Sequence, residues 1–459
     1  MSDLLQWLHR PQAAAVAAGF VASAVLIITL RLKRPERHKR GTLVRSGNAA
    51  QRKGTRRRKH SPDVLTLAGV PIPLLDETKH FKLIGTTGTG KSTAIRELLG
   101  RALQRGDRAI ITDPDGGYQA RFYRRARADV ILNPFEHDSV KWNLFDEIRN
   151  PYDVEQVSSG LVPSVEDASG QEWRGYARTF ITAVVRRCYQ AGWHDTAELW
   201  RLLMVASPEE LRPIVAGTPA QPFLDPDNAR MFGSIRSVGG SAIAALEYIQ
   251  AQRAASFAVR KWVDCGRGVL FIPYQARQIA ALRSIIATWV RLAIFEAMSQ
   301  PENQDQRLWF VVDELDALGA IDGLKDALAR LRKFGGRCVL GFQSIAQVSS
   351  TYGNQEAQTI VENCSTTLIL RCSSSEGGGT SAFASKLIGE REIIRKQTTH
   401  GRDREDFFSA KTRRSTNVSE QHLTEAAVMP SEIEQLPDLT GYLKTASSKE
   451  WLRVALPRR

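Results

Sequence analysis

The sequence predicts an α/β fold built on a parallel sheet, interrupted by an all-α insertion and preceded by a transmembrane helix. Three observations support this assignment. Short apolar runs alternate with segments of helical periodicity, as in strands that are joined by crossover helices. Between residues 151 and 260 only helical periodicity is found. Residues 11–30 carry no charge and are mostly apolar, which is typical of a membrane-spanning helix of about 20 residues.

The N-terminal part divides by composition into a short segment (1–10), a transmembrane helix (11–31) and a basic juxtamembrane linker (32–63). Residues 31–60 contain thirteen Lys or Arg and one acid, Glu36, and so hold +12 of the net charge of +14. Because basic residues flank the cytoplasmic end of a span, we expect a single-pass protein with its bulk in the cytoplasm. The alternative for the span is a cleaved signal peptide. The linker has two interpretations, attraction to anionic lipid or guidance of DNA.

The remaining chain is expected to form a nucleotide-binding domain in two parts, 64–150 and 261–459, around an all-α insertion at 151–260. The predicted strands are short apolar runs, namely residues 80–84, 108–112, 129–132, 268–273, 308–312, 337–342 and 366–371. Helical spacing predicts helices over 171–190, 197–205, 208–215 and 234–259. The five cysteines are scattered without a CxxC pair, which excludes a common type of zinc site and a disulfide framework.

A complete GxxxxGK[ST] phosphate loop follows the first of these strands and precedes a helix, the context that supports such a match. Its glycines allow backbone N–H groups to turn toward phosphate oxygens. Lys91 would contact the β and γ phosphates, and Ser92 would offer a hydroxyl to Mg²⁺. We therefore predict ATP and Mg²⁺ as ligands of a loop formed by Gly85, Thr86, Thr87, Gly88, Thr89, Gly90, Lys91, Ser92 and Thr93.

Two carboxylates, Asp313 and Glu314, follow the apolar strand predicted at 308–312. We expect Asp313 to hold Mg²⁺ and Glu314 to act as the base that deprotonates the attacking water. Both would lie with the phosphate loop, because ligands bind at the carboxyl ends of parallel strands. The alternative is an acidic helix start.

Gln343 follows the strand predicted at 337–342, where its amide can sense the γ phosphate and help to position water. On spacing alone, a polar helix start explains Gln343 equally well. Arg332 precedes the same strand and, by composition, belongs to a solvated basic face.

Together these segments resemble the TraD/TrwB-type conjugative coupling proteins of type IV secretion. The resemblance extends from His80 to Tyr442 through the stretches HFKLIGTTGTGKST, GDRAIITDPDG, ILNPF, NLFDEIRNPYD, LWFVVDELDALG, RKFGGRCVLGFQSIAQVSSTYG and MPSEIEQLPDLTGY. It implies a RecA-like nucleotide-binding domain interrupted by an all-α domain, in a homo-hexameric ring at the bacterial inner membrane. The implied partners are single-stranded DNA, the relaxase and the proteins of the secretion channel.

The implied activity is DNA-stimulated ATP hydrolysis that pumps single-stranded DNA with its relaxase during conjugation. The resemblance also gives Gln343 a contact with the nucleotide phosphates and Arg332 a reach into the ATP site of the neighbouring subunit. In one respect the sequence departs from the family pattern, since one predicted span precedes the linker where the family usually has two. Two other functions fit the motifs, an adaptor ATPase that recruits protein substrates and a chromosome-type DNA pump.

Overall fold

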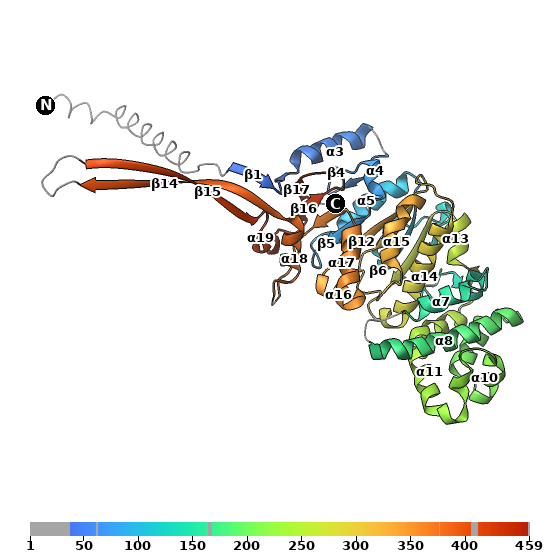
Figure 1. The fold of residues 1–459 in the computed structure, drawn as a ribbon. Coiled ribbons are helices and arrows are strands. Elements are labelled where there is room, and N and C mark those ends of the chain that lie inside the picture. Colours follow the sequence, from blue (N-terminus) through green and yellow to red (C-terminus); the bar gives the residue numbers. More distant parts are fainter. Residues whose placement is uncertain (1–36, 61–62, 164–167, 376, 405–411, 458–459) are drawn as a thin grey trace, which may run out of the picture. The chain divides into compact units, whose positions relative to one another are not determined.

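The computed structural model describes residues 37–60, 63–163, 168–375, 377–404 and 412–457 (Figure 1). These residues belong to two compact units. The smaller unit comprises the chain up to Leu43 together with Ile388–Val428. The larger unit comprises Val44–Leu387 and the chain from Met429 onward, and it contains every motif named above.

A mixed ten-stranded sheet organises the larger unit. Seven of its strands, β13, β5, β12, β11, β6, β10 and β7, are parallel in that order, so their carboxyl ends share one edge. The prediction of a parallel α/β sheet is therefore confirmed. The full order is β2 (Val44–Ser46), β17 (Trp451–Ala455), β16 (Thr440–Lys444), β13 (Thr366–Ile369), β5 (Phe81–Ile84), β12 (Gly336–Phe342), β11 (Leu308–Val312), β6 (Arg108–Pro114), β10 (Val269–Tyr274) and β7 (Val130–Ile131).

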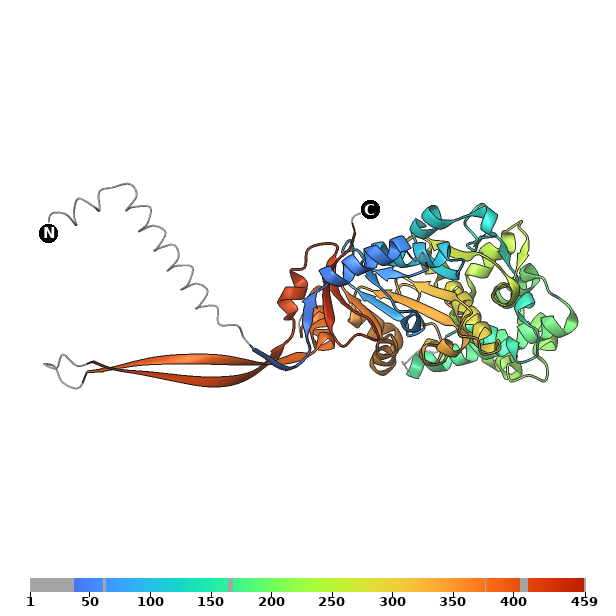
Figure 2. The ribbon, with the colours of Figure 1, turned by 90° about the horizontal axis from the view of Figure 1, so that it is seen from above.

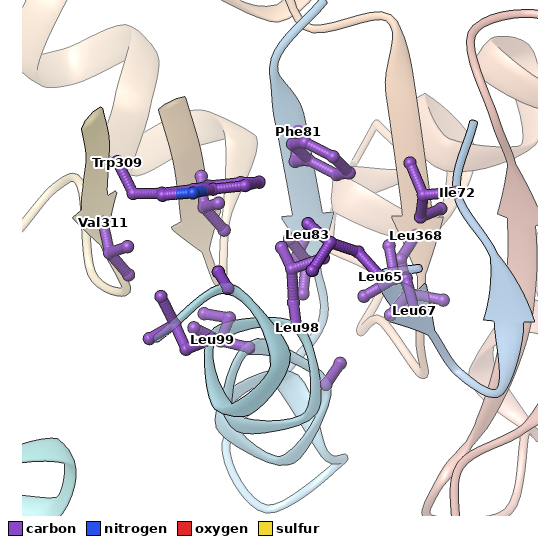
Figure 3. Close-up of a cluster of buried hydrophobic side chains, with 14 of the residues drawn as sticks. Leu65, Leu67, Ile72, Phe81, Leu83, Leu98, Leu99, Trp309, Val311 and Leu368 are labelled. Atoms are coloured by element: carbon purple, nitrogen blue, oxygen red, sulfur yellow. The ribbon is translucent and has the colours of Figure 1, made fainter. Parts of the chain in front are cut away.

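Helix α5 (Lys91–Gln104) covers one face of this sheet with an apolar stripe. Leu98 and Leu99 are fully buried among strand residues such as Leu83 and Val311 (Figure 3). Full burial of a leucine side chain stabilises the fold by about 1.5–3 kcal/mol. This packing holds the first turn of α5, and so the phosphate loop, at a fixed place on the sheet.

Helices dominate the inserted region, and Figure 1 shows α8, α10 and α11 gathered away from the sheet of the same unit. One expectation here is wrong, because 234–259 is not a single helix. One helix ends at Ile243, and a second begins at Ala245 and ends at Ala251. Ser256 and Phe257 then form a short strand that pairs with Lys141 and Trp142. The helices are α7 (Asp153–Leu161), α8 (Ala168–Ala191), α9 (Thr196–Met204), α10 (Pro208–Val215), α11 (Ala229–Ile243), α12 (Ala245–Ala251) and α13 (Val259–Cys265).

The larger unit contains further strands and helices, and Figure 2 shows the ribbon turned by 90°. Its further strands are β3 (Thr66–Leu67), β4 (Val70–Pro71), β8 (Lys141–Trp142) and β9 (Ser256–Phe257). Its further helices are α3 (Asn48–His60), α4 (Leu74–Glu77), α6 (Gly117–Phe122), α14 (Ile279–Ser299), α15 (Leu324–Arg330), α16 (Ile345–Tyr352), α17 (Asn354–Asn363), α18 (Gly379–Ile388) and α19 (Pro430–Glu434).

Part of the region predicted as a basic linker is folded onto the larger unit. Strand β2 pairs in parallel with β17, and α3 follows it. The side chain of Gln51 on α3 donates hydrogen bonds to Ala68 O and Ala455 O, both at 2.7 Å. Residues 44–60 thus begin the folded unit rather than only leading to it.

The smaller unit is a three-stranded antiparallel sheet in the order β1, β14, β15. Strands β14 (Glu390–Arg404) and β15 (Thr412–Ala426) form a long hairpin whose register runs from Glu390 opposite Ala426 to Arg404 opposite Thr412. Strand β1 (Arg37–Gly41) pairs with the other edge of β14. Salt bridges link Glu392 to Lys39 and Arg40 across this pair.

The predicted single-pass membrane location requires correction. Within the residues that the structure describes, no helix is long and apolar enough to cross a bilayer. The segment expected to do so, 11–31, lies outside the described residues, and so does the short segment 1–10. The prediction of a membrane-spanning helix therefore rests on the apolar composition of 11–31 alone, and no described helix supports it.

Candidate active site

The phosphate loop joins the end of β5 to the start of α5, at the carboxyl edge of the sheet. Gly88 and Gly90 have φ angles of 78° and 117°, which glycine adopts without strain. At Gly85, a Cβ atom would lie 2.8 Å from the Cβ of Leu370. The three glycines thus permit a close turn whose backbone N–H groups can face an anion.

Lys91 is buried at the first position of α5. Its ammonium group donates to Gly85 O at 2.6 Å and to Thr86 O at 3.4 Å. Burial lowers the pKa of Lys91, while the nearby carboxylates of Asp313 and Glu314 act to raise it. The carboxylates therefore favour the charged form of the lysine at the place where phosphates would bind.

Asp313 follows β11 and receives two hydroxyl hydrogen bonds on one carboxylate oxygen. Ser92 Oγ and the Tyr118 hydroxyl each donate to Asp313 Oδ2 at 2.7 Å. Asp313 Oδ1 is buried and has no hydrogen-bond partner in the described part of the chain. Hydroxyl and carboxylate oxygens are the ligands that Mg²⁺ prefers, so Ser92 and Asp313 fit the predicted metal site.

A chain of hydrogen bonds crosses the site through Gln343. Its amide nitrogen donates to Glu314 Oε1 at 3.2 Å, and its amide oxygen accepts from Thr87 Oγ1 at 2.8 Å. Burial raises the pKa of Glu314, with further contributions from Asp313 and Asp316. A raised pKa makes the carboxylate a stronger base, and Gln343 connects that base to the phosphate loop.

These groups face one cavity of about 360 Å³. Of the predicted site residues, it is lined by Thr86, Thr87, Gly88, Gly90, Lys91, Ser92, Thr93, Asp313, Glu314 and Gln343. Thr89 instead stabilises the loop from within, since its hydroxyl donates to Thr86 O at 2.7 Å. Arg332 is exposed on the 3₁₀ turn Leu331–Phe334 and does not line this cavity.

Residues that the sequence did not single out complete the wall of the cavity, among them Arg96, Asp115, Tyr118 and Leu439. Leu439 comes from the C-terminal part of the chain and has a φ of 61°. Its backbone N–H donates to Thr89 O at 3.0 Å, which fixes it beside the phosphate loop. The stretch DPDGGY at the end of β6 was a visible signal for Tyr118, whereas nothing in the sequence placed Leu439 here.

Comparison with known proteins shows the family of this chain. The family described as type IV secretion-system coupling protein DNA-binding domain matches residues 64–457. The chain belongs to the type IV secretion-system coupling protein family. The resemblance inferred from the motifs is thus confirmed.

The coupling protein TraD of Escherichia coli (strain K12) is 30% identical over 390 residues, covering 83% of this chain and 52% of TraD. This chain therefore spans about half the length of TraD. The coupling protein TrwB in complex with the ATP analogue ADPNP has a TM-score of 0.79 and 32% identity, covering 93% of this chain and 95% of TrwB.

TrwB in complex with ADP and Mg²⁺ also has a TM-score of 0.79, with 31% identity and coverage of 93% and 96% of the two chains. A nucleotide and Mg²⁺ are thus the ligands of a closely similar fold. These complexes confirm the prediction of ATP and Mg²⁺ as ligands.

Proposed function

We propose that this coupling protein is a DNA-dependent ATPase that drives single-stranded DNA, with its attached relaxase, into a type IV secretion channel during conjugation. The observation that carries the proposal is that Asp313 and Glu314 line one cavity together with Lys91 and Ser92. That arrangement suits phosphoryl transfer to water. The description of the matching family as a DNA-binding domain supports DNA as the substrate.

Each side chain has a separate task in this mechanism. Lys91 and the backbone N–H groups of the loop bind the phosphates of ATP. Ser92 and Asp313 would hold Mg²⁺, which when bound would supply positive charge beside the phosphates of ATP. Glu314 accepts the proton of the attacking water, and Gln343 couples the position of Glu314 to that of Thr87.

The transition state would gain a further positive charge from Arg332 of a neighbouring subunit. Arg332 is exposed and does not line the cavity of its own chain, which leaves it available to another copy. An arginine supplied in this way accelerates hydrolysis by about 10³–10⁵ in known cases. This role requires a closed ring, for which we propose the homo-hexamer.

Displacement of a block from DNA tests the proposal. The full chain is incubated with ATP, Mg²⁺ and single-stranded DNA that carries biotin-bound streptavidin at one end. We expect ATP-dependent release of streptavidin, and none with Lys91→Ala. If ATP is hydrolysed at the same rate without DNA and the streptavidin remains bound, the protein is not a translocase and the adaptor function becomes the better account.

A further inference from the structure

Tyr118 contacts the metal-binding carboxylate although nothing in the mechanism above uses it. The side chain is 1% exposed, and its hydroxyl donates to Asp313 Oδ2 at 2.7 Å. Ser92 Oγ donates to the same oxygen at the same distance. Two hydroxyl groups, one from α5 and one from α6, therefore fix the position of one carboxylate.

Tyr118 is itself held firmly. Its backbone N–H donates to Asp113 Oδ1 at 2.9 Å, at the start of α6. The guanidinium carbon of Arg96 lies 5.5 Å from the centre of its ring, within the range of a cation–π contact.

The contact decides which oxygen of Asp313 is available to other groups. Asp313 Oδ2 accepts two hydrogen bonds, so both of its lone pairs are engaged. Oδ1 has no partner among the described residues, although it is buried. Rotation of the carboxylate would break both hydroxyl contacts at once, so the side chain is restricted to one orientation.

We propose that Tyr118 is a positioning residue for Mg²⁺, which acts by holding the Asp313 carboxylate in its metal-binding orientation. The inference rests on the proposed function, because it assumes that Ser92 and Asp313 hold the ion. Groups that hydrogen-bond to metal ligands typically change metal affinity by about 10–100-fold when they are removed. Tyr118 should therefore influence the metal without contacting the nucleotide phosphates.

The test removes only the hydroxyl. Binding of a fluorescent ADP analogue to the full chain is measured without divalent ions and during a titration with Mg²⁺. For Tyr118→Phe we expect the midpoint of the Mg²⁺ titration to rise about tenfold, while the affinity for metal-free ADP stays within about twofold. Tyr274→Phe is the matched control, because the Tyr274 hydroxyl is also buried but has no hydrogen-bond partner in the described chain.

A second measurement separates positioning of Asp313 from a general structural effect. In an Asp313→Asn background, Tyr118→Phe should leave the Mg²⁺ midpoint unchanged, since the carboxylate that it positions is gone. An effect that persists in that background would overturn the inference. So would a Mg²⁺ midpoint in Tyr118→Phe that is unchanged or lower, or an equal loss of affinity for metal-free ADP. If the unmodified protein shows no Mg²⁺-dependent nucleotide binding, the proposed function itself fails.

Discussion

Replacement of Glu314 by glutamine separates nucleotide binding from hydrolysis. Glu314 lines the nucleotide cavity and accepts a hydrogen bond from Gln343 at 3.2 Å. Glutamine has nearly the same shape and keeps a carbonyl oxygen that can accept this bond. It cannot take a proton from water, so only the function as a base is lost.

The size of the effect follows from what general bases contribute to catalysis. Loss of a positioned general base costs about 10²–10⁴ in turnover, equivalent to about 3–5 kcal/mol in the activation barrier. Lys91, Ser92 and the loop glycines are unchanged, so their contacts with the phosphates remain. Removal of one negative charge from the cavity also reduces repulsion of the phosphates. We therefore expect the affinity for ATP to be unchanged or higher.

Phosphate release and binding of a fluorescent ATP analogue are measured on the same preparation. Glu362→Gln serves as the control, because Glu362 lies outside the cavity and accepts a hydrogen bond only from Gln358 among the contacts described. Turnover within threefold of the unmodified protein would refute the assignment of Glu314 as the base. Loss of ATP binding in Glu314→Gln would instead make the residue part of the metal site or of the structure.

Three further predictions concern Lys91, Arg332 and His80. Lys91→Ala should abolish ATP hydrolysis, because it removes the ammonium group of the phosphate loop, and normal turnover would refute the site. Arg332→Ala should bind ATP but hydrolyse it poorly, and mixing it with Lys91→Ala should restore activity at intermediate ratios; no recovery in proven mixed rings would exclude a role in trans. Burial lowers the pKa of His80 to about 4 in the folded protein, whereas the ordinary value is 6.5. The unfolded chain therefore binds a proton more readily, and the free energy of unfolding falls as the pH drops from 6.5 toward 4. The difference in the free energy of unfolding between the unmodified protein and His80→Asn, measured by chemical denaturation, should shrink by about 2 kcal/mol between pH 7 and pH 5. A difference that stays constant would contradict the burial argument.

The strands and the site motifs were predictable because their signals are local. Short apolar runs such as 308–312 are typical of the buried strands of a parallel sheet. The phosphate loop and the acids after β11 lie at strand ends, so the topology alone brings Lys91, Asp313 and Glu314 together. Hydrogen bonds through Gln343 and Thr87 agree with that placement.

Features that depend on contacts between distant residues were not predictable. Tyr118 meets Asp313 across 195 residues, and Leu439 reaches the phosphate loop from the C-terminal part of the chain. The hairpin of β14 and β15 lacks apolar alternation over much of its length, so residues 390–420 gave no strand signal. The strand and helix within residues 44–60 were not predicted either, because the basic composition of this segment is typical of a solvated linker.

The most direct test of the account is the rate of ATP hydrolysis by the full chain with and without single-stranded DNA. The account predicts that single-stranded DNA raises turnover several-fold and that Lys91→Ala has no activity in either condition. It also predicts that double-stranded DNA of equal length stimulates less. Hydrolysis that is equally fast with no DNA, or that survives in Lys91→Ala, would contradict the claim that this site drives DNA.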